Sequence, residues 1–248
     1  MCKTTLEICA GDIASVLAAA EGGADRVELC SALGEGGVTP SAALTAAAVA
    51  VPGLRTNVLV RPRGGDFLYT TEEKDIILAD IAHCLKAGAD AVVVGALLPD
   101  GRVDAPFLSR CVEAAGGMEV TFHRAFDLCA DPMAALAEIA KAGCTRVLTS
   151  GQARTAEEGI ALLRELVLRG KELGVSIMPG GGVTPDNARR IIDATGATEI
   201  HASARGPVKS KMSFRRGGVS MGAAGADEYL ISQTSAAIVR GIVDALRR

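Results

Sequence analysis

The sequence is poor in aromatic residues: tryptophan is absent, and Phe, Tyr and Trp together make up 3% of its 248 residues. The hydrophobic share of 49% must therefore come mainly from Ala, Val, Leu and Ile. With 22% charged residues and no low-complexity linker, this composition predicts one domain with a large aliphatic core.

Several signals for other protein classes are also missing. No apolar run approaches the ~18 to 20 residues that cross a membrane, and no export signal is recognisable, so we expect no membrane partner. The net charge is −3, and the short basic cluster between Lys209 and Arg216 stands alone, which argues against a nucleic-acid partner. Seven cysteines form an odd count without the spacing of a disulfide framework, which favours a reduced, cytoplasmic setting.

A short unit recurs along the chain: a helical stretch ends in a corner such as Gly23-Ala24-Asp25, and an apolar strand follows. Glycine at the corner permits the left-handed conformation that ends a helix, and the β-branched run after it favours a strand. The unit predicts eight strands, at residues 4–9, 26–30, 57–61, 91–95, 118–123, 146–150, 175–178 and 199–203.

Strands that alternate with helices pair in parallel. The sequence therefore predicts an α/β fold, a single-domain (β/α)8 TIM barrel over residues 1–248. An open doubly wound sheet is the alternative, but no dinucleotide-type glycine pattern supports it. Residues 206–226, rich in Gly and Ser, are expected to form either a flexible loop over the C-terminal face of the barrel or a surface excursion.

Side chains alternate along a strand, so the apolar face packs under the helices and the other face points into the lumen. This rule predicts a polar lumen, whereas barrel interiors are normally aliphatic. The lumen residues that could act as catalysts are Glu7, Glu28, Arg61, His123 and His201. We expect the Arg61 guanidinium to bridge Glu7 and Glu28 and so to offset the cost of burying them. Such a network is either purely structural or part of a functional site.

Catalytic residues of these barrels lie at the C-terminal ends of the strands and in the loops that follow. The ends of the seventh and eighth strands are where many barrels bind phosphate, and here they carry Gly180, Gly181, Gly182, Ser203 and Arg205. The glycines are either an anion-binding loop or only a tight turn. With an anion bound there and at Arg61, the lumen carboxylates and histidines would transfer protons in an enzyme acting on a small anionic or sugar-like metabolite.

A pair of cysteines indicates a different chemistry. Cys9 and Cys30 end adjacent strands, whose backbones lie about 4.8 Å apart. Two thiolates suit a soft ion such as copper(I), and Met178 would be a further soft donor if it lay across from them. Such a pair also arises by chance in a chain with seven cysteines, so spacing alone makes this the weaker alternative. Zinc is less favoured still, because no close Cys and His spacing is present.

Motifs spread over nearly the whole chain are shared with one known family. They are Leu6-Glu7-Ile8-Cys9 and the stretches at residues 23–30, 36–41, 61–67, 121–127, 148–151 and 212–215. Together they resemble the CutC family, named copper homeostasis proteins.

The resemblance implies a TIM barrel, a cytoplasmic location, assembly into homo-oligomers and a link to copper, with Cys9 and Cys30 as copper ligands. The loop at residues 180–185 is richer in Gly and Pro than is expected of the family. The resemblance supplies no reaction. Two hypotheses therefore stand, a copper(I)-binding protein and an enzyme acting on a small anionic metabolite, with a binding barrel without chemistry as a third.

Overall fold

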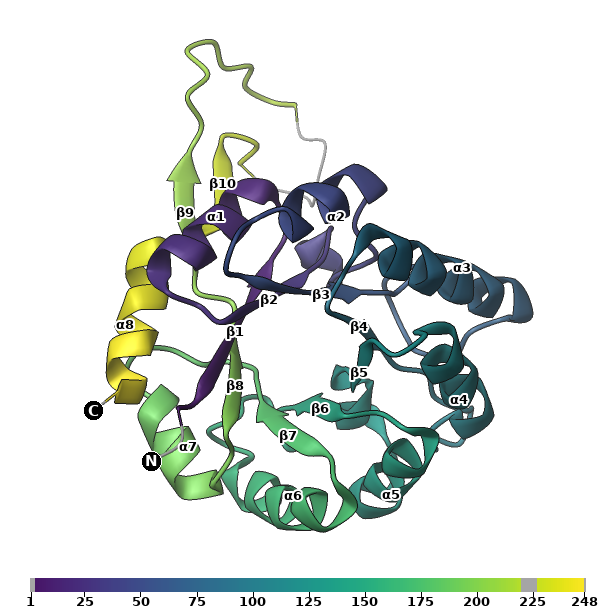
Figure 1. The fold of residues 1–248 in the computed structure, drawn as a ribbon. Coiled ribbons are helices and arrows are strands. Elements are labelled where there is room, and N and C mark those ends of the chain that lie inside the picture. The colour runs from purple at the N-terminus through teal and green to yellow at the C-terminus, as the bar shows by residue number, and fades with distance from the viewer. Residues whose placement is uncertain (1–2, 220–226, 248) are drawn as a thin grey trace.

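The computed structural model describes residues 3–219 and 227–247, and it is a barrel of eight parallel strands wrapped by helices (Figure 1). Neighbouring strands pair in the order β7-β6-β5-β4-β3-β2-β1-β8, and a single parallel bridge between Gly180 and His201 joins the two ends of the sheet. The strands are β1 Thr5–Ala10, β2 Arg26–Leu29, β3 Arg55–Leu59, β4 Ala91–Val94, β5 Glu119–Phe122, β6 Arg146–Thr149, β7 Ser176–Pro179 and β8 Glu199–Ala202. The predicted TIM barrel is confirmed, and the doubly wound alternative is excluded.

The helices form the outer ring. They are α1 Ile13–Gly22, α2 Ala42–Val49, α3 Thr71–Ala87, α4 Ala105–Ala114, α5 Pro132–Ala142, α6 Ile160–Leu173, α7 Ala188–Thr195 and α8 Ala236–Arg247, with short 3-10 helices η1 Leu33–Glu35 and η2 Arg124–Leu128. Among the described residues, no helix combines the length and apolarity needed to cross a membrane.

Local sequence signals set the helix ends. α3 begins with a capping box, in which the Thr70 hydroxyl accepts from the Glu73 N–H and the Glu73 carboxylate accepts from the Thr70 N–H. α1 ends at Gly22 and is capped by Gly23, whose φ of 87° lies in the left-handed region. Two residues later the Asp25 carboxylate accepts from the Leu6 N–H at 3.0 Å, so this corner ties the end of α1 to β1.

The alternation of side chains follows the prediction for β1 and β2. Leu6 and Ile8 are fully buried in the core beneath the helices, as are Val27 and Leu29. The intervening side chains therefore point into the lumen. β3 begins two residues earlier than predicted and ends at Leu59, so Arg61 lies beyond the strand.

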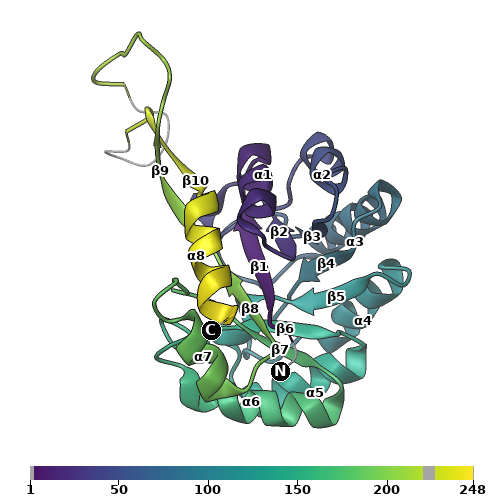
Figure 2. The same cartoon turned by 60° about the vertical axis from the view of Figure 1, so that its left-hand side comes forward.

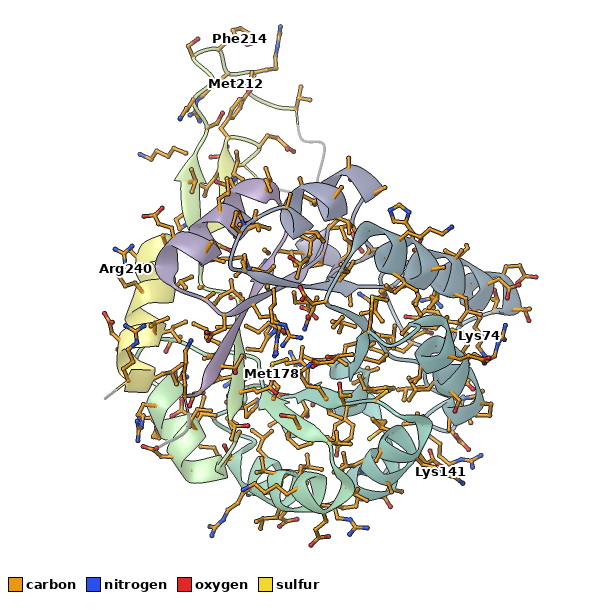
Figure 3. All side chains as sticks on the ribbon, in the orientation of Figure 1. Lys74, Lys141, Met178, Met212, Phe214 and Arg240 are labelled. Atoms are coloured by element: carbon orange, nitrogen blue, oxygen red, sulfur yellow. The ribbon has the colours of Figure 1, made fainter. Side chains whose placement is uncertain are left out.

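After β8 the chain forms an arm, which we define as residues 205–219 and 227–234. In this arm β9 Arg205–Lys209 pairs antiparallel with β10 Leu230–Thr234. The arm extends away from the barrel in both views (Figures 1 and 2), and Met212 and Phe214 lie at its far end (Figure 3). The flexible loop expected at residues 206–226 includes residues 220–226, which lie outside the described residues.

Candidate functional site

The lower part of the lumen, which we call the floor, is a network of paired charges. Arg26 donates from Nε to Glu7 Oε2 and from Nη2 to Glu199 Oε2, both at 2.5 Å. Arg146 donates from Nε to Glu199 Oε2 at 2.6 Å and from Nη2 to Glu119 Oε2 at 3.0 Å. Buried carboxylates and guanidinium groups thus compensate one another, as burial of charge requires.

The predicted bridge by Arg61 between Glu7 and Glu28 is wrong. Because Arg61 lies past the end of β3, its guanidinium donates instead to the backbone carbonyls of Glu35, Gly37 and Gly65, at 3.0, 2.8 and 2.6 Å. It therefore fixes the loops at the rim of the barrel. Arg26 and Arg146, and not Arg61, are the cations that pair with the carboxylates in the lumen.

The floor arginines were missed, although the sequence contained a signal for one of them. Arg26 lies two residues before Glu28 on the same strand, so the alternation rule places both side chains in the lumen. Arg146 opens β6, a strand whose mixed composition did not reveal its inward face. Met178 also points inward (Figure 3), but its sulfur accepts from Arg26 Nη2 at 3.2 Å and belongs to the floor.

The upper part of the lumen, which we call the mouth, contains the two predicted thiols. Cys9 Sγ lies 3.5 Å from Cys30 Sγ, and both side chains are buried against Leu59 and Val93. A carboxylate oxygen of Glu28 and the two sulfurs all lie within 4.8 Å of one another. In the described part of the chain, this is the one group of three or more potential metal-ligating side chains at such spacing. The hydrogen bond with Cys30 and burial raise the pKa of the Cys9 thiol well above its ordinary value.

His201 connects the floor to the mouth. Its Nδ1 lies 2.8 Å from Glu7 Oε1, and its Nε2 lies 3.8 Å from Glu28 Oε2. Although burial disfavours the cation, the neighbouring Cys9 thiol and the Glu7 carboxylate raise the pKa of His201 well above its ordinary value. Burial opposes ionisation of Glu7, but the hydrogen bond with His201 and the charge of Arg26 lower its pKa to about 2. Burial raises the pKa of Glu28 despite the attraction of His201, and the charge of Glu7 adds to that effect.

His123 follows β5 on the opposite side of the mouth. Its Nδ1 accepts a hydrogen bond from the Ala125 N–H at 3.1 Å, whereas its Nε2 is buried without a hydrogen-bond partner. Burial and the positive charge of Arg61 lower the pKa of His123 to about 3. The ring packs against Phe67, with the ring centroids 4.9 Å apart.

A cavity of about 180 Å³ opens at the mouth and brings most of the predicted residues together. Six residues that the sequence predicted as site residues line it: Cys9, Glu28, Arg61, His123, His201 and Arg205. The other lining residues are Arg124, Leu33, Gly36, Leu59, Phe67 and Leu148. Glu7 lies beneath the cavity as a partner of His201. A larger cavity, of about 940 Å³, lies at the N-terminal face beside α7 and α8, where the corner residue Asp25 lies. We place the candidate site at the mouth because its ionisable groups converge there.

The predicted glycine loop does not line this cavity. Gly181 has a φ of 103° and lies beside Arg124, since a Cβ at Gly181 would be 3.4 Å from Arg124 Nη1. Arg124 is held at the rim by Asp127 at 2.6 Å and by the Ser150 hydroxyl at 2.9 Å. Sequence reasoning missed Arg124 as a site residue, although it directly follows His123 at a strand end. The anion-binding role predicted for Gly180, Gly181, Gly182, Ser203 and Arg205 stays a prediction.

The fold and the mouth define a (β/α)8-barrel protein with thiol, carboxylate and imidazole groups gathered at the C-terminal ends of its strands. A family model described as the CutC family matches residues 4–206, and the chain belongs to this family.

Relatives and solved structures agree with the family assignment. A protein of Chromobacterium violaceum named "family protein CutC" is 51% identical over 97% of each chain. The human "Copper homeostasis protein cutC homolog" is 43% identical over 95% of this chain and 86% of its own. The crystal structure of CutC from Streptococcus agalactiae superposes with a TM-score of 0.77 at 30% identity, covering 81% of this chain and 98% of that one.

More distant structures share the fold alone. Phosphoribosylanthranilate isomerase from Thermotoga maritima has a TM-score of 0.57 at 14% identity, with 98% of each chain covered. A likeness at this level carries no function.

Proposed function

We propose that this protein binds copper(I) at the mouth of the barrel through Cys9 and Cys30. The observation that carries the proposal is the 3.5 Å separation of the two sulfurs, one on β1 and the other directly after β2. The donor set fits the ion, because thiolates are the soft ligands that copper(I) prefers. The names of the relatives from human and mouse, which refer to copper homeostasis, support the same assignment.

The surroundings of the pair determine how the ion would be held. The Glu28 carboxylate is near enough to both sulfurs to serve as a third donor. Binding must displace thiol protons, so copper(I) affinity should rise with pH. The proposal places the protein in a reducing cytoplasm, and the six described cysteines, all free thiols, are compatible with that.

An anaerobic copper(I) titration against a competing chelator tests the proposal. Loss of a residue that only supports a metal ligand typically lowers metal affinity by roughly 10- to 100-fold. In the double variant Cys9→Ser, Cys30→Ser, which removes the ligands themselves, we expect copper(I) affinity to fall by more than that. The matched control is Cys84→Ser, because Cys84 is also buried but lies in α3 away from the mouth. Equal affinity of wild type and double variant would overturn the proposal.

A second candidate function is an enzyme acting on a small anionic or sugar-like metabolite. The mouth cavity favours it, because Glu28 and His201 line the cavity together with Arg61, Arg124 and Arg205. A carboxylate and an imidazole with raised pKa values are candidates for proton transfer near neutral pH, and the arginines would attract the anion. A thermal-shift screen of small anionic metabolites tests this function, since any bound ligand raises the melting temperature.

We further propose that the protein forms a homo-oligomer through the arm. The arm exposes Met212, Phe214 and Ile231, and a two-stranded sheet alone is marginally stable in water. Residues 205–234 carry five Lys or Arg and two Asp or Glu, which gives this segment a net charge of +3. Because the whole chain has a net charge of −3, the remainder has a net charge of −6. Opposite charges would attract the arm of one copy to the barrel of a second.

Light scattering coupled to gel filtration tests the proposed assembly. Phe214→Asp should lower the measured mass, whereas Leu168→Asp on α6, a similarly exposed apolar position, should not. A wild-type protein that stays monomeric at all concentrations would exclude assembly through the arm.

A further inference from the structure

The imidazole of His123 is held in one tautomer. Because Nδ1 accepts from the Ala125 N–H at 3.1 Å, the proton of the neutral ring must be on Nε2. That Nε2–H group is buried and has no hydrogen-bond partner in the described structure. An unpaired buried donor costs about 1–3 kcal/mol. His123 is one of the residues that line the mouth cavity, and a molecule bound there is the candidate acceptor for this donor.

Packing fixes the direction of this donor. The ring lies against Phe67 on one side, and on another it lies so near Gly95 that a Cβ there would be 2.5 Å from two ring atoms. Gly95 directly follows β4, so the end of that strand leaves room for the histidine. A donor that is held in place before binding loses little entropy when the ligand arrives.

The positive charge around the cavity is not fully neutralised by carboxylates. Arg61 donates to three uncharged backbone carbonyls, and the charge of Arg124 is offset by Asp127. Arg205 is exposed at the cavity edge and forms no ion pair among the described residues. Burial, and after it the charge of Arg61, lower the pKa of His123 and keep the ring neutral, so that His123 contributes a dipole and not a further cation.

The size of the cavity limits the ligand. A volume of about 180 Å³ lies below the roughly 300 Å³ at which drug-sized sites begin. A nucleotide cofactor is therefore too large to fit inside, whereas a compound of two to four carbon atoms with an anionic group is not.

We propose that His123 is a ligand-binding residue, which donates from Nε2 to a carbonyl or hydroxyl oxygen of a small hydroxy or keto acid, or of its phosphate ester, whose anionic group lies toward Arg124 and Arg205. The inference rests on the second function proposed above. It differs from the sequence-based prediction in placing the anionic group at Arg124 and Arg205 and not at the loop of Gly180, Gly181 and Gly182. It does not require copper, although Cys9 and Glu28 line the same cavity.

Calorimetric titration of the full chain with three probes tests the inference. The probes are glycolate, 2-phosphoglycolate and inorganic phosphate, which separate the hydroxy acid, its phosphate ester and the bare anion. We expect at least one of the first two to bind more tightly than phosphate. His123→Phe, which keeps an aromatic ring against Phe67 but removes the donor, should weaken that binding about tenfold, a typical effect for a lost hydrogen bond.

Two further variants separate the possible outcomes. His123→Gln retains an N–H donor and should stay nearer wild type, and His83→Phe on the exposed face of α3 should have no effect. Binding that Arg205→Gln weakens but His123→Phe leaves unchanged would overturn the role of His123 and leave the anion site standing. If none of the three probes bound at millimolar concentration, both the role of His123 and the anion site would be overturned.

Nitrogen NMR of the ligand-free protein gives a second, ligand-independent test. His123 should be a neutral Nε2–H tautomer across neutral pH, with an Nε2 signal that shifts when a probe binds. An Nδ1–H tautomer or an imidazolium would contradict the inference.

Discussion

The floor and the mouth of the lumen differ in how their buried polar groups are paired. In the floor, Arg26 bridges Glu7 and Glu199, and Arg146 continues the network, so each charged group has a partner of opposite sign. In the mouth, two thiols contact each other, and the Nε2 of His123 has no partner. Both regions lie inside the same eight strands, so the fold alone does not decide which residues are structural.

The difference suggests how to separate structural from functional polarity in a barrel of this kind. A network of paired charges stabilises the fold, because burial of a charge is offset only when its partners are in place. A donor left without a partner weakens the fold, and its presence in a cavity is explained when a ligand completes it. The comparison predicts large stability effects in the floor and small ones in the mouth.

The largest expected effect is that of Arg26→Met. The substitution leaves the Glu7 and Glu199 carboxylates buried with one fewer cation, and breaking a buried pair costs about 3–5 kcal/mol of unfolding free energy. Urea denaturation measures the change. The control Arg169→Met removes an exposed pair with Glu172 on α6 and should cost less than about 1 kcal/mol. Similar losses in the two variants would show that the floor network does not stabilise the fold.

The sequence predicted the faces of the strands but not the partners across the lumen. Alternation placed Glu7, Cys9 and Glu28 correctly, because each lies between apolar residues on a strand whose outer face is unambiguous. It also held for Cys30, which directly follows β2. It assigned the bridging cation to Arg61 because the end of β3 was placed two residues too late. Pairing across a barrel depends on the relative heights of the strands, which no single strand encodes.

The sequence also could not predict that the Nε2 of His123 lacks a hydrogen-bond partner. Its position at a strand end made it a candidate, but its tautomer depends on the η2 turn, which brings the Ala125 N–H to Nδ1. The space that it occupies depends on Gly95 from a neighbouring strand. Such contacts between distant residues appear only when the coordinates are known.

A smaller loss of stability, about 1–3 kcal/mol, is expected for Gly95→Ala. The new methyl group would overlap the His123 ring and would also lie 3.2 Å from the Cβ of Ala125, and overpacking of a rigid site has this typical cost. Gly34→Ala is the control, since a Cβ there has no neighbour within 4 Å. Urea denaturation compares the two variants. If Gly95→Ala were as stable as Gly34→Ala, the fixed position of His123 would be disproved.

The pH dependence of stability provides the third comparison. Burial and the charge of Arg61 lower the pKa of His123 from 6.5 to about 3, so between these values the unfolded chain binds more protons than the folded one. Stability therefore falls as the pH is lowered below 6.5, by up to about 1.4 kcal/mol per pH unit from this residue. Between about pH 6.5 and about pH 5.5, wild type should lose about 1 kcal/mol more than His123→Phe in urea denaturation. Parallel losses in the two proteins would mean that His123 is protonated in the fold.

The smallest effect is expected for Arg205→Gln, and its size distinguishes an arginine of the mouth from one of the floor. Arg205 is exposed, and the pairing of its backbone with Thr234 does not involve the side chain, so the unfolding free energy should change by less than about 0.5 kcal/mol. Arg146→Gln, which breaks the contacts with Glu119 and Glu199, should lose several times more. A large loss for Arg205→Gln in urea denaturation would show that its charge stabilises the fold. In that case the mouth would resemble the floor, and an unpaired cation at the rim would no longer indicate a ligand.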